Sequence, residues 1–314
     1  MTMRPRGRYL LLVDASSFIH RSFHALPRLS RRSDGLQTGA LAGFCKTMMK
    51  LFRLNWTPIG SLPSYAAVIC DTRGKNFRHD LYPQYKQQRK PYDPELEVQL
   101  PWIPTIAKAF NVPCIGMPGW EADDIIATYA RLGIESGMEV VIASSDKDLC
   151  QLVRADPDGV VLMYDSMKDK GPEDNAAAMI SPLEVYRRNG VPPSKIVDFQ
   201  ALTGDVVDNI PGVPGFGPKT AAKLLENFDD VFALIDAAEW EPDKFNPKEC
   251  EKILAHRDDI LMSRRLASLA SDVPVDVTVR DLKTTPISSH QLRSLFIDLE
   301  FMHLLDLVDR APRF

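Results

Sequence analysis

The chain has 314 residues, of which 45% are hydrophobic and 25% are charged, and its formal net charge is −4. This length can bury one large core or two smaller ones, and the composition is typical of a globular protein. No run of about 18 apolar residues is present, so we expect no transmembrane helix. The negative net charge argues against a nucleic-acid partner, unless the acids gather in a metal site and the bases on another face.

The N-terminus is basic and then apolar, as in a signal peptide. Its apolar part, residues 9–13, is too short for a signal sequence, and Asp14 ends it. We expect a first buried strand here, in a cytoplasmic protein. The five cysteines are odd in number and form no CxxC pair, which favours buried thiols in a reducing compartment over disulfides or a zinc cluster.

Three short apolar runs are each followed by acidic residues. Residues 9–13 precede Asp14, residues 66–70 precede Asp71, and residues 139–143 precede Asp146 and Asp148. Such runs fit strands buried on both faces of a parallel sheet, and helical patterns lie between them at 38–54, 95–110 and 121–136. We therefore predict an α/β fold with a mostly parallel, doubly wound sheet flanked by helices. The carboxyl ends of its strands, with their acids, should converge in one crevice.

After about residue 180 the pattern becomes helical. Prolines in the first turn predict helix starts at 181–185 and 191–195, and one short β-like stretch lies at 273–279. We expect an α/β domain over residues 1–180 and a helical domain over 181–314. Residues 55–65 and 165–180 are expected to be exposed loops.

Residues 119–127 read GWEADDIIA and place three acids at the start of an apolar helix. A helix cap explains one acid, but three repel one another unless a cation lies between them. Glu121 and Asp124, at i and i+3, can face the crevice together, whereas Asp123 should point further round the helix.

Three groups of acids form one candidate metal-binding set. They are the acids that follow the strands, the acids of the GWEADDIIA helix and two further acids near residue 205. Any one of them alone is more simply a turn or cap residue. Together they predict oxygen ligands for two Mg²⁺ or Mn²⁺ ions, which can promote phosphodiester cleavage. Asp205 and Asp208 are expected on one helical face. The predicted metal ligands are Asp14, Asp71, Glu121, Asp123, Asp124, Asp146, Asp148, Asp205 and Asp208.

Residues 72–90 interleave bases with aromatic rings. They can be an ordinary solvated loop, or a clamp for a single strand in which cations neutralise phosphates and rings stack on bases. The predicted DNA contacts here are Arg73, Lys75, Phe77, Arg78, Tyr82, Tyr85, Arg89 and Lys90.

Residues 212–222 read GVPGFGPKTAA. This is not a phosphate-binding P-loop, because Pro218 separates Gly217 from Lys219 and no buried strand precedes it. The segment is either a plain helix–helix turn or a helix N-terminus that binds a DNA backbone phosphate. The predicted DNA contacts are Gly215, Gly217, Lys219 and Thr220.

His20 and His24 have a spacing seen in metal sites, but the abundant oxygen ligands argue against that role. Arg21, between them, is a better candidate for contacting the scissile phosphate.

Five segments, in this order along the chain, resemble those of the 5′-nuclease (flap endonuclease) superfamily. They are similar to the 5′→3′ exonuclease domain of bacterial DNA polymerase I or a stand-alone relative. The segments are LLLVDASSFIHRSFHAL, ICDTRGKNFRHDLYPQYKQQRK, GWEADDIIA, SSDKDLCQLV and ALTGDVVDNIPGVPGFGPKTAAKLL.

The resemblance implies a PIN-like nuclease fold and a metal-dependent enzyme of DNA replication and repair. Such an enzyme removes 5′ ends and 5′ flaps at junctions between single-stranded and double-stranded DNA. It implies that Lys86 is the arch lysine and Arg21 the phosphate-contacting arginine. Residues 72–100 would form a helical arch, and residues 203–225 a helix-two-turn-helix that grips the duplex, with a K⁺ ion.

The resemblance also divides the acids between two ions. Asp14, Asp71, Glu121, Asp123 and Asp124 would serve the first, and Asp146, Asp148, Asp205 and Asp208 the second. We expect a monomer in the bacterial cytoplasm, associated with the nucleoid and with a DNA polymerase as partner.

Two alternatives are kept. One is a non-catalytic, structure-selective DNA-binding protein of the same fold, and the other is a metal nuclease that acts on RNA. The balance of exonuclease and flap endonuclease action, and whether the chain stands alone or belongs to a longer polymerase, are left open.

Overall fold

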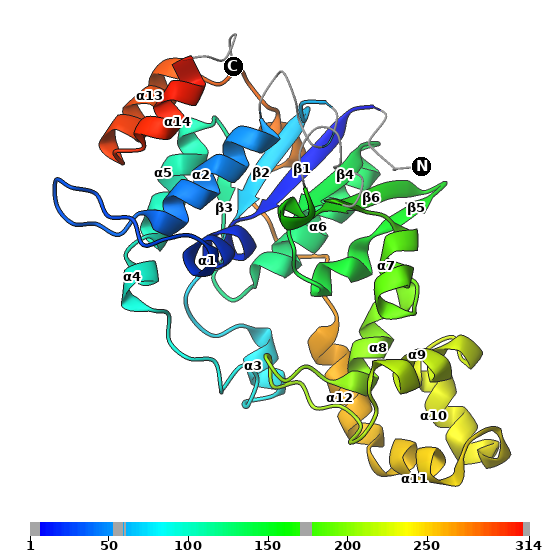
Figure 1. Cartoon of the computed structure of the whole chain (residues 1–314). Helices are drawn as coiled ribbons and strands as arrows, with labels where there is room; N and C mark the ends of the chain where they lie inside the picture. Colours follow the sequence, from blue (N-terminus) through cyan, green and yellow to red (C-terminus); the bar gives the residue numbers. More distant parts are fainter. Residues whose placement is uncertain (1–6, 53–58, 60, 170–177, 310–314) are drawn as a thin grey trace.

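The computed structural model describes residues 7–52, 59, 61–169 and 178–309 (Figure 1). Residues 55–58 and 60 of the loop expected at 55–65 and residues 170–177 of the loop expected at 165–180 lie outside the described residues. No helix in the described part of the chain is long and apolar enough to cross a membrane.

One twisted sheet forms the centre of the molecule, with strand order β3-β2-β1-β4-β6-β5 and β7 paired to β6. Five strands run parallel, and β5 and β7 run antiparallel to β6. The predicted mostly parallel α/β fold is confirmed. Its strands are β1 (Tyr9–Asp14), β2 (Tyr65–Ile69), β3 (Cys114–Ile115), β4 (Glu139–Ala143), β5 (Arg154–Asp156), β6 (Gly159–Tyr164) and β7 (Met179–Ile180).

The strand register places the predicted acids at one edge of the sheet. Val13 lies opposite Val68 of β2 and Ala143 of β4, so the three central strands end at the same level. Asp14, Asp71 and Asp146 follow within a few residues and therefore emerge side by side.

Alternate residues of β1 enter two different cores, as expected for a strand buried on both faces. Tyr9, Leu11 and Val13 pack in a core with α1 (Ala15–Ala25), α2 (Gly39–Leu51) and α5 (Ile103–Ala109). Leu10 and Leu12 pack on the other face with α6 (Ala122–Glu135).

The second core continues into a group of helices at the lower right of Figure 1. The chain contacts itself most extensively there between α8 and α12. The helices are α7 (Pro182–Asn189), α8 (Ile196–Thr203), α9 (Pro218–Asn227), α10 (Val231–Trp240), α11 (Pro247–Ala255) and α12 (Arg257–Ala267).

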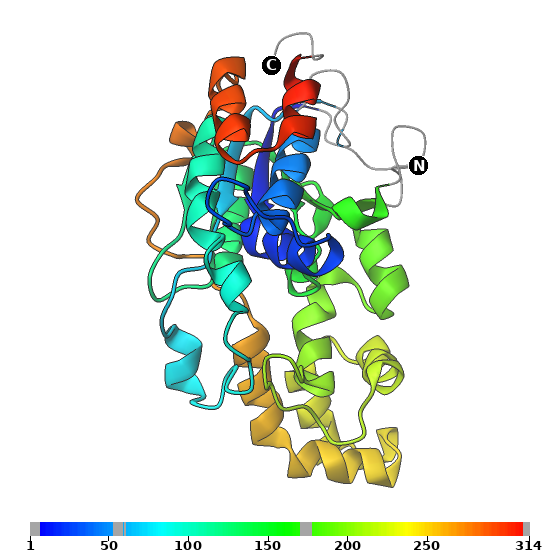
Figure 2. The ribbon, with the colours of Figure 1, turned by 60° about the vertical axis from the view of Figure 1, so that its left-hand side comes forward.

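The last two helices return to the α/β part. In Figures 1 and 2, α13 (Ser289–Asp298) and α14 (Met302–Asp309) lie beside α5 and α2, far from α9 to α11. Leu292, Phe296 and Leu304 are fully buried in the same core as Tyr9 and Leu11. The division at 180/181 stays a prediction, but these helices do not pack with the helical group.

Three local expectations differ from the structure. The helical arch expected over 72–100 is α-helical only in α3 (Phe77–Leu81) and α4 (Pro94–Glu97), because Pro83 and Pro91 interrupt the segment. The β-like stretch expected at 273–279 forms no strand, and Pro274 lacks the N–H that a strand ladder needs.

The third difference concerns Asp205 and Asp208. They lie in a loop rather than on a helical face, because α8 ends at Thr203 and Gly204 has φ +69°. Asp205 and Ile210 form an antiparallel bridge that closes the loop. The strands β3, β5, β6 and β7 were not expected from the sequence.

Candidate functional site

A cleft of about 340 Å³ lies beyond the carboxyl ends of the central strands. Basic and aromatic side chains from 86–92, together with His20 and Lys147, complete its wall. Eight of the nine predicted carboxylates line it: Asp14, Asp71, Glu121, Asp123, Asp146, Asp148, Asp205 and Asp208.

Asp14 ends β1 and is also the N-cap of α1. Its Oδ1 accepts the Ser17 N–H at 3.0 Å, and its Oδ2 accepts the Ser144 hydroxyl at 2.6 Å. Burial raises the pKa of Asp14 to about 7 against these hydrogen bonds, and the nearby Asp71 and Asp146 raise it further. The sheet fixes the position of the Asp14 carboxylate. A negative charge there is unfavourable unless a cation lies nearby.

Asp71 connects the end of β2 to the start of α6. Its Oδ2 accepts the Ser16 hydroxyl at 2.6 Å and its Oδ1 accepts the Ala122 N–H at 2.9 Å. This carboxylate therefore satisfies one of the free N–H groups of the α6 N-terminus while it faces the cleft.

The two aspartates of the GWEADDIIA segment point in different directions, and the sequence-based expectation for them is reversed. Asp123 lines the cleft, where burial, followed by repulsion from Asp146 and other acids, raises its pKa well above the usual value. Asp124 is fully buried and faces away from the cleft. The i, i+3 spacing instead pairs Glu121 and Asp124 in a capping box at the start of α6.

Arg78 explains why Asp124 turns away. Its Nη1 and Nη2 each lie 2.8 Å from an oxygen of Asp124, and Nη1 lies 3.1 Å from Glu121. Its remaining N–H groups donate to the carbonyls of Leu266 at 2.8 Å and Ser268 at 3.0 Å. Arg78 is 1% exposed, so it does not offer a DNA contact, contrary to the prediction.

Two of the predicted aromatic DNA contacts also pack against other residues of the protein, and one of them is buried. Tyr85 is 3% exposed, and its hydroxyl donates to Glu121 at 3.0 Å. Phe77 packs against Trp120, with ring centroids 5.4 Å apart, and against the Arg78 guanidinium at 4.5 Å. Aromatic spacing alone could not distinguish rings that pack inside from rings that stack on bases.

The basic segment, residues 72–90, lies across the cleft and contacts the loop between α8 and α9. Lys86 Nζ contacts Glu121 and lies 3.5 Å from Asp208, and Arg89 also pairs with Asp208. The Lys86 N–H donates to the Asp208 carbonyl at 3.0 Å. Burial would raise the pKa of Glu121, but Lys86 and Arg78 hold it below the usual value.

A second set of contacts surrounds Asp148 and Asp205. Burial raises the pKa of Asp148 to about 7, and repulsion from Asp146 adds to this. Lys147 lies between Asp146 and Asp148 in the sequence. Its Nζ pairs with Asp205 at 2.6 Å across the cleft. Asp205 Oδ1 accepts the Val207 N–H at 2.8 Å, which holds the loop in a turn.

The donor set fits hard divalent cations in its chemistry. As the side chains stand, no group of three or more His, Cys, Asp or Glu side chains in the described ranges is arranged to hold a metal ion. Mg²⁺, however, keeps several waters and needs only one or two carboxylates directly. Three acids of the cleft have raised pKa values, Asp14, Asp123 and Asp148, and a cation would relieve the repulsion among them.

Arg21 does not line this cleft. Its Nη1 pairs with Asp165 at 3.2 Å, and the side chain borders a separate pocket with Lys46 and Lys50. Its neighbour His20 lines the cleft instead and packs against Tyr92, with ring centroids 4.9 Å apart. One residue along a helix turns the side chain by about 100°, which sequence spacing could not resolve without the orientation of α1.

Several predicted DNA contacts are exposed on the surface. Gly217 is the N-cap of α9, and the first turn of this helix carries exposed Lys219 and partly exposed Thr220. Tyr82 is partly exposed, and the remaining exposed positions are Arg73, Lys75, Arg89, Lys90 and Gly215.

No site role was predicted from the sequence for His20, Tyr92, Lys147 or Ser144. Lys147 had a usable signal, because it lies between two predicted ligands. Ser144 and Tyr92 carry no comparable sequence signal.

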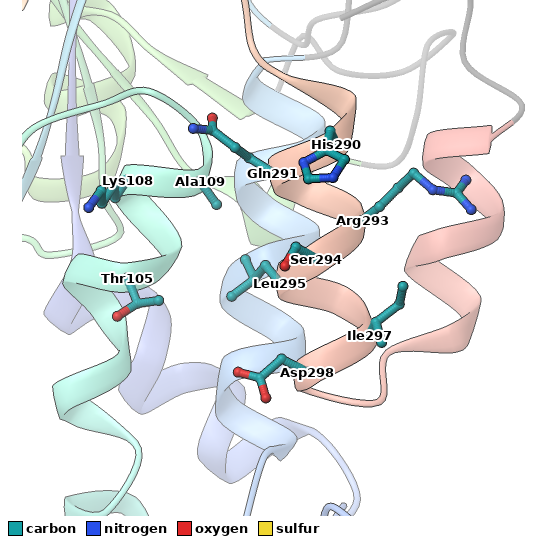
Figure 3. Close-up of a pocket in the computed structure, with 10 residues that line it drawn as sticks. All are labelled: Thr105, Lys108, Ala109, His290, Gln291, Arg293, Ser294, Leu295, Ile297 and Asp298. Atoms are coloured by element: carbon teal, nitrogen blue, oxygen red, sulfur yellow. The ribbon is translucent and has the colours of Figure 1, made fainter.

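A larger cleft, of about 850 Å³, lies elsewhere, between α5 and α13 (Figure 3). Lys108, His290 and Arg293 line it with Ile297 and Asp298. None of the predicted site residues reaches it, so its size does not identify it as the reaction site.

Two family models match the chain. Residues 9–188 match "5'-3' exonuclease, N-terminal resolvase-like domain", and residues 191–290 match "5'-3' exonuclease, C-terminal SAM fold". Together they include all the residues that line the acidic cleft.

Curated relatives and solved structures agree with these models. DNA polymerase I of Rhizobium leguminosarum is 46% identical over 98% of this chain, and the match covers 29% of that protein. The 5'-3' exonuclease of Aquifex aeolicus is 36% identical over 97% of this chain and 96% of its own length. A bacteriophage T5 flap endonuclease, solved with DNA and metal ions, shares the fold at 18% identity, with a TM-score of 0.63 over 96% of this chain and 99% of that chain.

The chain spans about a third of the length of the DNA polymerase I relatives it matches. One relative that it matches over nearly its whole length is a 5'-3' exonuclease. The chain belongs to the 5′-3′ exonuclease family.

Proposed function

We propose that the chain is a metal-dependent 5′→3′ exonuclease and 5′-flap endonuclease. It hydrolyses DNA phosphodiester bonds at junctions between single-stranded and double-stranded DNA. The observation that carries this proposal is the cleft at the carboxyl edge of the sheet, where eight carboxylates meet. The nuclease names of the relatives, and the DNA and metal ions in the T5 structure, support it.

We assign Asp14, Asp71, Glu121 and Asp123 to one divalent cation and Asp146, Asp148, Asp205 and Asp208 to a second. Asp124 is left out because Arg78 neutralises it. When bound, Mg²⁺ or Mn²⁺ lowers the pKa of a water and stabilises the departing oxygen in such reactions.

Lys86 and Arg89 have the charge and position to receive the scissile phosphate. Both line the cleft while they pair with Asp208. Cations at this place would attract the phosphate of a bound strand and would offset charge that develops on it. Lys86 keeps its predicted catalytic role in this proposal, whereas Arg21 does not.

The outer surface provides contacts to the DNA backbone. The exposed N-terminus of α9, with Gly217 and Lys219, can bind a duplex phosphate, and a K⁺ ion at residues 203–225 is part of this proposal. Arg73, Lys75 and Lys90 add positive charge beside the cleft. Contacts of this kind read shape rather than sequence and weaken with salt.

We further propose that the protein acts in the bacterial cytoplasm, as a monomer, in primer or flap removal with a DNA polymerase. The share of DNA polymerase I that the chain matches supports the polymerase connection.

A DNA substrate labelled at its 5′ flap tests the function. We expect cleavage with Mg²⁺ or Mn²⁺ and none with EDTA, and Asp146→Asn should remove it. The matched control is Asp156→Asn, which changes an acid on β5 outside the cleft. Binding of the flap without any cleavage would favour the non-catalytic alternative, and faster cleavage of an RNA flap would favour the RNA nuclease.

A further inference from the structure

Two of the five cysteines lie against each other behind the acidic cleft. Cys70 directly follows β2, and Cys114 is the first residue of the neighbouring strand β3. Their Sγ atoms are 2.7 Å apart, and the Cys70 N–H donates to the Ile115 carbonyl at 2.8 Å. The sheet therefore fixes both backbones and holds the two thiols together.

Exposure separates this pair from the other cysteines. Cys45, Cys150 and Cys250 are buried, whereas Cys70 and Cys114 are both partly exposed. A small oxidant can therefore reach the pair more readily than any of the other thiols. The hydrogen bond between the two thiols also lowers the pKa of Cys114, which favours Cys114 as the attacking thiolate.

Both cysteines belong to segments that carry cleft carboxylates. Cys70 precedes Asp71, whose carboxylate is bound by Ser16 and the N–H of Ala122. The chain after β3 leads directly to Glu121 and Asp123. A covalent bond between the pair would constrain the ends of both segments.

We propose that Cys70 and Cys114 form a reversible disulfide when a hydroperoxide oxidises them, and that this cross-link lowers activity at the adjacent cleft. The effect on activity rests on the proposed function, whereas the cross-link does not.

The chemistry balances with hydroperoxide as the oxidant. The Cys114 thiolate attacks the O–O bond, so an S–O bond forms, and the released oxygen leaves as water or an alcohol after taking a proton. The Cys70 sulfur then attacks the sulfenic sulfur. An S–S bond forms, the S–O bond breaks and a second water leaves, so the two thiols lose two electrons to the peroxide. A dithiol reductant reverses the step by exchange.

The test treats the whole reduced chain with hydrogen peroxide, blocks remaining thiols with N-ethylmaleimide under denaturing conditions and maps the peptides by mass spectrometry. We expect a linked peptide that joins positions 70 and 114, with maleimide on the other three cysteines. Flap cleavage should fall at least severalfold and return with dithiothreitol.

Cys114→Ser and Cys70→Ser are the informative variants, and Cys150→Ser is the matched control at a buried thiol. We expect both informative variants to lose the cross-link and to keep their cleavage rate under peroxide, and the control to behave as wild type. No 70–114 peptide in the wild type, or a different pairing, would overturn the proposal. A cross-link without an activity change would overturn its second part, whereas a reduced protein that cuts no flap would refute the proposed function and leave the cross-link standing.

Discussion

The buried Arg78 joins three parts of the molecule through one side chain. It extends from α3, binds Asp124 at the start of α6 and donates to two carbonyls at the end of α12. Because all of these partners surround it away from solvent, its charge is fully compensated inside the protein.

Removing the positive charge of Arg78 should lower the stability of the folded protein. We expect Arg78→Met to lower the free energy of unfolding by about 3–5 kcal/mol, because Asp124 would be left buried and unpaired. Urea denaturation followed by circular dichroism measures it. The exposed pair of Arg73 and Glu97 gives the control, because Arg73→Met should cost less than about 1 kcal/mol. Adding Asp124→Leu to Arg78→Met should recover part of the loss, and an equal loss in both arginine variants would contradict this role.

Substitutions at the neighbouring Asp123 and Asp124 should have different effects, the first on catalysis and the second on the stability of the fold. We expect Asp123→Asn to lower cleavage by roughly two orders of magnitude without loss of stability, since it removes a charge that its neighbours repel. Asp124→Asn should instead lower the unfolding free energy and leave the Mn²⁺ affinity close to wild type. Flap cleavage, calorimetric Mn²⁺ titration and urea denaturation of both variants measure this. Stronger loss of metal affinity in Asp124→Asn would reverse our assignment.

At the scale of elements, the segment around α3 and the loop after α8 cover the acidic cleft together. Lys86 and Arg89 supply cations to carboxylates that we assign to metal ions. A metal ion that binds these acids must compete with the two side chains.

This competition can be measured without a substrate. We expect Lys86→Met to tighten Mn²⁺ binding about fivefold, because one partly buried ion pair worth about 1 kcal/mol no longer opposes it. The same variant should cut flaps more slowly, since it lacks a cation for the phosphate. Lys90→Met, an exposed change in the same segment, is the control for both measurements. An unchanged Mn²⁺ affinity in Lys86→Met would show that Lys86 does not compete.

Most of the helices and strands that carry the site could be predicted from the sequence. The runs before Asp14 and Asp71 are apolar without an alternation of apolar and polar residues. This pattern and the short length of the runs sufficed to predict parallel strands that end together. By contrast, β3 has two residues and β7 has two, which is too short for any periodic signal. The helical arch that the family resemblance implied over 72–100 is α-helical only in α3 and α4, because Pro83 and Pro91 interrupt the segment.

Within the site, residue type was predictable and orientation was not. Carboxylates after three strands indicated the cleft. The directions of Asp123, Asp124 and Arg21 depend on how α6 and α1 are rotated against the sheet, which Arg78 and the core decide. Long-range partners such as Ser268 for Arg78 leave no trace in local spacing.

At the scale of the whole molecule, the gathered acids should make the metal-free fold sensitive to pH. Burial raises the pKa of Asp14 and Asp148 from 3.8 to about 7, so the folded state binds more protons than the unfolded state between these values. Stability is therefore expected to fall as pH rises through that interval.

We expect the melting temperature in EDTA to decrease from about pH 5 to about pH 8, and saturating Mg²⁺ to remove most of that decrease, because the ion replaces the protons. Differential scanning calorimetry in both conditions measures the effect. Asp14→Asn and Asp148→Asn should each flatten the EDTA profile, whereas Asp156→Asn should not. A melting temperature that rises with pH in EDTA would contradict the raised pKa values.

The return of α13 to the α/β part should also contribute to overall stability. We expect Phe296→Ala to lower the unfolding free energy by about 3–5 kcal/mol, because its ring is fully buried beside the sheet. The adjacent Ile297 is 57% exposed, so Ile297→Ala should change it by less than about 0.5 kcal/mol. Urea denaturation compares the two. Similar losses would mean that α13 is not held through Phe296.

The same packing has a consequence during synthesis. A ribosome releases β1 first, but Leu292, Phe296 and Leu304, which cover the core around Tyr9 and Leu11, are translated only after the helical group. The nascent α/β part therefore carries an uncovered apolar face while the whole helical group is being made. Folding of this part can be completed only after about residue 304 has left the exit tunnel, so the interval before then is when the chain most needs a chaperone.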